Sequence, residues 1–315
     1  MKLLLSVLAL TSALFAGVPA TLSAQSLEPV AYFDGSASEF PEGIAIDHQG
    51  NVYLSLVFAG KIKKVTPEGV TSDYAQVPDS WLLGMTFDHR GNLMVLGSSG
   101  IWKVSPAGVT TFFAAIPDHA FINDLAADNR GNLYVTDSFR YAIWKVDTQA
   151  KVTLWCQDPL LQGAVSIFPN TLGPNGIRFT NNMKTLHVAI TSAGTLLAID
   201  VNRDGTAGPA RVVVTDPSLV GADGIEIDDC GNTYIAVNIQ DRIARVSRDG
   251  KLSTVIEGDI LATPTALVFG RGHDSRSLYI SNNGNVFFSG NPQDESLVRL
   301  DLDNHHGRSC GRNGK

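Results

Sequence analysis

The stretch GIAIDHQGNVY runs from Gly43 to Tyr53, and a closely similar stretch, GIEIDDCGNTY, runs from Gly224 to Tyr234. Each contains a short alternating run, a polar turn with Gly-Asn, and the start of a second alternating run. Alternation of apolar residues with a period of two predicts β-strands. Repetition of the pattern predicts a fold built from one repeated unit.

The first run of this pattern occurs six times, and its four further copies begin at Gly84, Asp124, Gly176 and Ala266. A second and a third apolar run follow in each copy, and a fourth follows in several. In the third copy these runs are Asn132–Val135, Ile143–Val146 and Val152–Trp155. Four strands per copy, at a spacing of roughly 40 to 50 residues, are typical of a β-propeller blade.

The two ends of the repeated region complement each other. The sixth copy lacks a fourth strand after Leu300, and the run Val30–Phe33 precedes the first copy without a partner. We expect this N-terminal strand to complete the last blade, because ring closure removes exposed sheet edges. The sequence therefore predicts an all-β, six-bladed β-propeller of four-stranded blades over residues 25–307, followed by a polar C-terminal tail at 308–315.

The first 24 residues predict a secretory signal peptide, because a basic start and the apolar run Leu3–Leu10 are followed by small residues. A membrane helix is the alternative, but it needs about 20 mostly apolar residues, and Gly17 and Pro19 interrupt the run. Cleavage after Ala20 or Ala24 stays open. We expect a secreted or periplasmic protein with no stable membrane span.

Composition limits the partners and the cross-links. The net charge is −7 and only 24 residues are Lys or Arg, without the clustered positive charge that nucleic acid requires. The hydrophobic content of 44% is sufficient for a large core. Cys156, Cys230 and Cys310 allow at most one internal disulfide, and the pairing stays open.

In a propeller the first strand of every blade lines the central channel, so equivalent residues of the repeats meet around one axis. The residues just before the Gly-Ile position are, in blade order, Glu42, Leu83, Asn123, Asn175, Asp223 and Thr265. Four of these carry strong oxygen donors. Average composition would seldom place such a set at equivalent positions entering apolar strands.

Glu42, Asn123, Asn175 and Asp223 combine two carboxylates with two amides, which are hard ligands for a divalent cation. Calcium takes about 6 to 8 oxygens in irregular geometry, whereas zinc prefers His or Cys. The sequence therefore predicts one calcium ion at the channel. The alternative is that the four residues cap the strands and bind channel water. The free energy needed to bury unpaired carboxylates favours the ion.

Four short motifs open the matching blades in a characteristic order, and they are Pro41–Gly43, Ile122–Asp124, Pro174–Gly176 and Ala222–Gly224. With these motifs the mature chain resembles the senescence marker protein/gluconolactonase family of calcium-dependent six-bladed propellers. Diisopropyl-fluorophosphatase and the paraoxonases are more distant relatives in this resemblance. It implies that Glu42, Asn175 and Asp223 ligate the ion, that Asn123 lies beside the ion or binds substrate, and that Asp223 serves in catalysis.

One position departs from the family pattern. Sugar-lactonase members carry an arginine two residues before the blade-three asparagine, and here that residue is Phe121. Further aromatic residues occur in loops expected to border the same face, and the predicted pocket set is Phe58, Trp81, Phe121, Phe139 and Phe168. Pockets are mainly apolar, so this set favours an apolar lactone or ester as substrate, although some of these rings could simply pack the loops.

His119, on the loop that approaches Asn123, is a candidate proton shuttle, and a solvated histidine is the plainer interpretation. The sequence holds no Gly-x-Ser-x-Gly, His-Glu-x-x-His or phosphate-loop motif. The leading hypothesis is a secreted calcium-dependent hydrolase of small lactones, esters or phosphotriesters, with Asp223 as base or nucleophile. The alternative is a noncatalytic propeller that binds a partner and holds a structural calcium ion.

Overall fold

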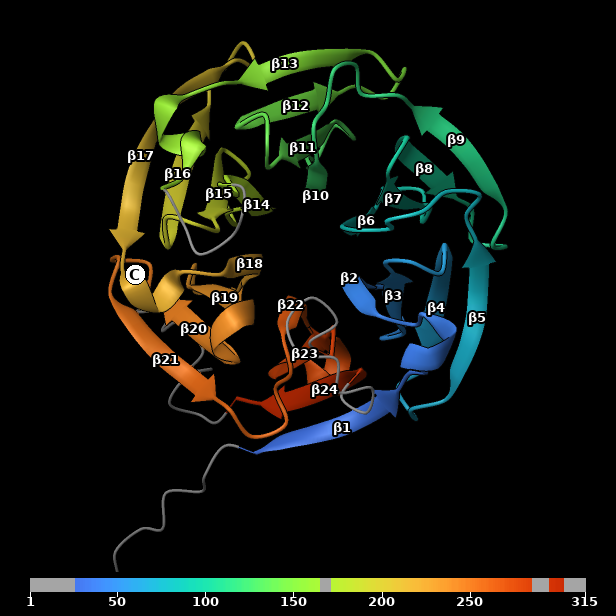
Figure 1. Cartoon of the computed structure of the whole chain (residues 1–315). Helices are drawn as coiled ribbons and strands as arrows, with labels where there is room; N and C mark the ends of the chain where they lie inside the picture. The colour runs from blue at the N-terminus through green and yellow to red at the C-terminus, as the bar shows by residue number, and fades with distance from the viewer. Residues whose placement is uncertain (1–25, 165–170, 285–294, 303–315) are drawn as a thin grey trace, which may run out of the picture.

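The computed structural model describes residues 26–164, 171–284 and 295–302. Within these ranges the chain forms six four-stranded sheets arranged as blades around a central axis (Figure 1). This architecture confirms the predicted six-bladed propeller. The predicted signal peptide and the predicted C-terminal tail lie outside the described residues.

In the first five blades the chain runs from the axis to the rim. The strands of blades 1 to 3 are β2 (Pro41–Ile46), β3 (Val52–Leu56), β4 (Lys61–Val65) and β5 (Thr71–Gln76); β6 (Met85–Phe87), β7 (Leu93–Gly97), β8 (Gly100–Val104) and β9 (Thr110–Ala114); and β10 (Ile122–Ala127), β11 (Leu133–Asp137), β12 (Ala142–Val146) and β13 (Val152–Cys156). Those of blades 4 and 5 are β14 (Pro174–Phe179), β15 (Thr185–Ile190), β16 (Thr195–Val201) and β17 (Ala207–Thr215); and β18 (Ala222–Ile227), β19 (Thr233–Val237), β20 (Arg242–Val246) and β21 (Leu252–Glu257).

The sixth blade joins the two ends of the chain. It contains β22 (Pro264–Phe269), β23 (Ser277–Asn282) and β24 (Ser296–Asp301), and its rim strand is the N-terminal β1 (Leu27–Tyr32). β1 pairs antiparallel with β24, with Leu27 opposite Leu300. Figure 1 shows β1 along the outer side of β24. The predicted closure of the ring is therefore confirmed.

The remaining regular elements of the described chain are short 3₁₀ turns, and none of these helices has the length and apolar character needed to cross a membrane. They are η1 (Gly35–Ala37), η2 (Pro159–Gln162), η3 (Pro217–Leu219), η4 (Asn238–Gln240) and η5 (Gly272–Asp274).

An aspartate organises the turn between the first two strands of four blades. In blade 1, Asp47 Oδ1 accepts hydrogen bonds from the backbone N–H groups of Gln49 and Asn51, both at 2.9 Å, and Oδ2 accepts one from Asn51 Nδ2. Gly50 has a φ of +86°, which favours glycine. The same bonds recur in blades 2, 3 and 5, so the repeated Asp-x-x-Gly-Asn motif is a turn motif.

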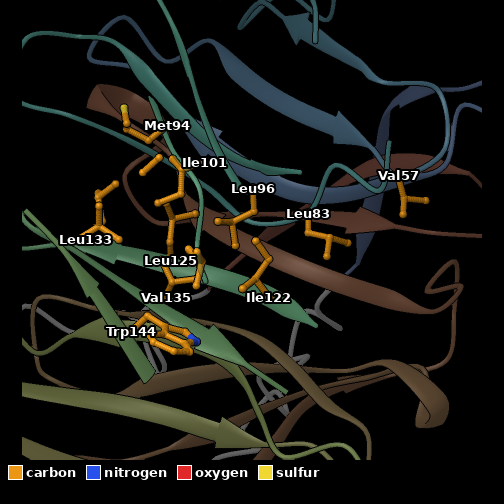
Figure 2. Close-up of a cluster of buried hydrophobic side chains, with 13 residues drawn as sticks. Val57, Leu83, Met94, Leu96, Ile101, Ile122, Leu125, Leu133, Val135 and Trp144 are labelled. Carbon is orange, nitrogen blue, oxygen red and sulfur yellow. The ribbon is translucent and has the colours of Figure 1, made fainter. Parts of the chain in front are cut away.

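The core lies between neighbouring blades. Figure 2 shows the cluster between blades 2 and 3, where Leu96, Leu125 and Val135 are fully buried. Burial of one such side chain contributes about 1.5–3 kcal/mol. Each interface joins the faces of two blades. The apolar side chains that alternate along each strand therefore stabilise the packing between blades.

The described cysteines differ in state. Cys156 on β13 is a buried free thiol, and burial raises its pKa to about 11. Cys230, in the turn between β18 and β19, is disulfide-bonded. Cys310 lies outside the described residues.

We predict that His187 makes stability depend on pH. Its Nδ1 lies 2.8 Å from Thr233 Oγ1 of the next blade, and burial, aided by the charge of Arg211, lowers the pKa of His187 to about 4. The unfolded pKa is about 6.5, so protonation favours the unfolded chain. The stabilisation from neutral His187 is complete above about pH 6.5 and is lost as the pH falls towards 4.

Urea unfolding of the wild type and of His187→Gln at pH 7.5 and 4.5 measures this contribution. We expect the wild type to lose about 2 kcal/mol more than the variant between the two pH values. Equal losses in both proteins would show that His187 does not contribute.

Candidate active site

The structure brings the four predicted ligands together at the axis. Glu42 on β2, Asn123 on β10, Asn175 on β14 and Asp223 on β18 line both a narrow cavity in the channel and a larger cavity next to it. The two asparagines and Asp223 are buried. Register in the repeat therefore predicted which side chains meet, and their role as ligands stays a prediction.

Each of these four strands is irregular at its polar residue. The register between the first and second strands shifts at Glu42, Asn123, Asn175 and Asp223. Such bulges re-aim side chains and are frequent beside functional sites. Glycine follows three of the four residues, and a Cβ at Gly43 would clash with the carbonyl oxygen of Leu83 in blade 2. Bulge and glycine together let neighbouring strands approach at the axis.

A hydroxyl on the second strand satisfies the backbone at the bulge. Ser55 Oγ accepts from the N–H of Gly43 at 2.8 Å and donates to the carbonyl of Leu83 at 2.7 Å. Thr136 makes the equivalent two bonds in blade 3. Neither residue was predicted from the sequence, although each stands two residues after the tyrosine of its second strand.

The carboxylates of the site are electrostatically unfavourable without a cation. Burial raises the pKa of Glu42 well above its usual range, and the charges of Asp223 and Asp124 raise it further. Burial is also the main reason that the pKa of Asp223 rises to about 7; Asp124 adds to the rise, and hydrogen bonds from Asn238 and Asn175 oppose it. A bound cation would offset both burial penalties.

Of the two predicted amide ligands, Asn175 supplies a buried oxygen without a partner in the described chain. Asn175 donates its Nδ2 to Thr191 Oγ1 at 3.1 Å, and its buried Oδ1 has no hydrogen-bond partner within the described residues. Two carboxylates beside an unpaired amide oxygen form a donor set that fits a hard cation such as calcium. Over the same described ranges, no cluster of three or more His, Cys, Asp or Glu side chains is arranged to hold a metal.

Two asparagines that were not predicted from the sequence hold the carboxylates. Asn238 Nδ2 donates to Asp223 Oδ2 at 2.9 Å, and Asn283 Nδ2 lies 3.3 Å from Glu42 Oε2. A Cβ at Gly221 would lie 2.9 Å from Asn238 Oδ1, so glycine gives this amide its room. Both asparagines follow second strands, outside the first-strand frame that revealed the other residues.

The larger cavity has a volume of about 600 Å³, and its walls are mainly apolar. Trp81, Phe121 and Phe139 line it, with the Phe121 ring centroid 6.2 Å from Trp81 and 5.2 Å from Phe139. Phe58 packs against Trp81 at 5.1 Å. Phe168 lies outside the described residues. The aromatic lining thus comes from the loop that enters blade 2 and from blade 3, whereas the predicted pocket residue Phe58 packs behind Trp81 and does not line the cavity.

His119 also lines this cavity, and its buried Nδ1 has no hydrogen-bond partner in the described part of the chain. Its loop is held by Asp137, whose carboxylate accepts from the N–H groups of Ala120 at 3.0 Å and Phe121 at 2.8 Å. Asp137 is fully buried, and its role was not predicted from the sequence.

Known proteins resemble this chain in sequence. A family model described as SMP-30/Gluconolactonase/LRE-like region matches residues 40–283. Lactonase drp35 of Staphylococcus epidermidis is 27% identical over 221 residues, which cover 66% of this chain and 66% of that protein. Lactonase drp35 of Staphylococcus saprophyticus is 27% identical over 229 residues, covering 66% and 67%. The chain thus spans about two thirds of the length of these relatives.

Solved structures share the fold. A gluconolactonase from Xanthomonas campestris is 17% identical, with 90% of this chain and 91% of that chain covered and a TM-score of 0.69. The calcium-binding protein regucalcin from Agrobacterium tumefaciens is 18% identical, with 88% and 94% covered and a TM-score of 0.69. By the family match over residues 40–283, the chain belongs to the SMP-30/gluconolactonase/LRE-like family.

Proposed function

We propose that this protein is a calcium-dependent hydrolase of small lactones or esters. The convergence of Glu42, Asn175 and Asp223 on one cavity, with buried oxygens that lack a counter-charge, carries this proposal. Relatives named lactonase and gluconolactonase support the reaction class, and a structural neighbour named as a calcium-binding protein supports the metal.

Glu42, Asn123, Asn175 and Asp223 would hold the cation. When bound, calcium supplies Lewis-acid polarisation of the substrate carbonyl. Asn238 fixes one oxygen of Asp223 and thereby restricts its rotation. Asn283 does the same for Glu42. These donors orient the carboxylates before substrate arrives.

Asp223 is the residue for proton transfer or attack. As a base, it takes a proton from water while the water oxygen bonds to the carbonyl carbon. The ring C–O bond of the lactone then breaks, and the departing oxygen takes up a proton, which gives a hydroxy acid. As a nucleophile, Asp223 would form an acyl-enzyme that water then hydrolyses. His119 lines the same cavity and is the candidate for giving a proton to the departing oxygen.

The aromatic wall selects apolar substrates. Trp81, Phe121 and Phe139 offer a sugar lactone few partners for its hydroxyl groups, and unpaired hydroxyls are penalised on desolvation. We further infer from the first 24 residues that the enzyme is exported.

We predict that kcat/KM is at least tenfold higher for apolar lactones or aryl esters than for gluconolactone. Phe121→Arg should reverse part of this preference, because it introduces a donor for polar substrates. Phe112→Arg, the same change on rim strand β9, is the matched control. The measurement is hydrolysis of a substrate panel with and without chelator.

Preference for gluconolactone in the wild type would contradict the assignment of the pocket. Calcium binding without hydrolysis of any panel member would instead favour the noncatalytic binding module.

A further inference from the structure

A buried ionic network lies directly beside the candidate metal site. Arg178 on β14 places Nη1 2.8 Å from Asp124 Oδ2, and its Nε lies 3.6 Å from Glu226 Oε2. Only 17% of the Arg178 side chain and 9% of the Asp124 side chain are exposed. The three residues belong to the channel strands of blades 3, 4 and 5.

Asp124 and Arg178 share the narrow cavity with the predicted ligands. The negative charge of Asp124 disfavours ionisation of both Glu42 and Asp223 and therefore raises the pKa of each. Three carboxylates therefore contribute to the potential at the site, and Arg178 neutralises one of them. The two carboxylates beside it keep the pKa of Arg178 raised although burial alone would lower it.

Both oxygens of Asp124 are occupied. Oδ1 accepts from the N–H of Leu125 at 2.8 Å, and Oδ2 accepts from the N–H of Ile177 at 3.1 Å as well as from Arg178. Asp124 follows the predicted ligand Asn123 in sequence, but these hydrogen bonds direct its carboxylate to protein partners. Calcium sites tune their affinity by the number of ligand charges, so the pairing of this carboxylate matters for the site.

We propose that Arg178 is an internal counter-charge that sets the calcium affinity of the site. By pairing with Asp124, it offsets the carboxylate charge beside the ligands and keeps Asp124 out of the ligand set. The inference rests on the calcium site of the proposed function. Removal of Arg178 takes away the cation that Asp124 and Glu226 share and makes the channel more negative. Calcium should then bind more tightly, while the calcium-free protein becomes less stable.

If Arg178 only stabilised the fold, its removal would affect calcium affinity differently. Arg178 joins three adjacent blades, so its loss would lower the stability of the protein in either case. If its role is only structural, calcium affinity stays unchanged or falls. The direction of the change in calcium affinity therefore separates the two roles.

The test is a double-mutant cycle on chelator-treated protein titrated with calcium chloride in a calorimeter. Arg178→Met should lower the Kd about tenfold, and Asp124→Asn, which leaves Arg178 without this partner, should raise it about tenfold. The double variant should return close to the wild-type Kd. Thermal unfolding of Arg178→Met should show a lower Tm without calcium and a larger upward shift on calcium addition than the wild type.

Arg211→Met is the matched control, because Arg211 forms an exposed ion pair with Asp200 at 2.9 Å, and the Kd of this variant should equal that of the wild type. An unchanged or raised Kd in Arg178→Met, with calcium bound normally by the wild type, overturns this inference alone. A wild type that binds no calcium overturns the proposed function as well. If Arg178→Met does not fold, the double variant is compared with Asp124→Asn. A double variant that binds calcium as weakly as Asp124→Asn overturns the inference.

Discussion

Asp223→Asn is expected to lower kcat on the best lactone or ester by roughly 10²- to 10⁴-fold. Asparagine keeps an oxygen that can reach the cation, but it removes the negative charge and the basic lone pair. Calcium affinity should therefore weaken modestly while turnover collapses. Loss of a nucleophile would lower turnover at least as far. Steady-state kinetics at saturating calcium measure the effect.

Asp228→Asn is the matched control, since Asp228 lies in the same blade and caps a turn through backbone N–H groups. Its kcat should stay close to that of the wild type. A calcium-loaded Asp223→Asn protein with near wild-type kcat would place the catalytic base elsewhere, and His119 would be the next residue to replace.

Glu42→Gln is expected to raise the Kd for calcium by about tenfold or more, because a ligand charge is lost while the shape is kept. Activity should fall at limiting calcium and return in part at saturating calcium, since Glu42 ligates and does not react. Titration calorimetry and activity as a function of calcium concentration measure the two effects.

The exposed Glu68 in a rim turn provides the control Glu68→Gln. A Glu42→Gln protein that binds calcium as tightly as the wild type would remove Glu42 from the ligand set. If its activity stayed lost at saturating calcium, Glu42 would have a role in the reaction itself.

The fold could be predicted because the sequence features that specify it repeat at regular intervals. Period-two runs specify strands, and the sixfold recurrence specifies blades. The unpartnered runs at Val30–Phe33 and Leu297–Leu300 specified which strand closes the ring, and β1 pairs with β24 as expected. The frame also predicted which polar residues meet, since Glu42, Asn123 and Asp223 occupy one position of the repeat.

The residues that support the site could not be found in the same way. Asn238 and Asn283 hold the two carboxylates from loops after second strands, and Asp137 holds the pocket loop from the end of β11. Asn238 and Asn283 share one place in the repeat, four residues after the tyrosine of the second strand, but Asn238 contacts its own blade and Asn283 contacts the next blade, so the repeat does not specify the partner. Arg178 stands in the repeat frame, but its pairing with Asp124 depends on the distance between neighbouring blades.

Metal analysis together with calcium titration of the folded protein tests the calcium site most directly. We expect one tightly bound calcium ion per chain, which chelator removes, and a marked fall in Tm on its removal that added calcium reverses. Zinc in its place, or neither bound metal nor any shift of Tm on calcium addition, would contradict the assignment of Glu42, Asn123, Asn175 and Asp223 as a calcium site.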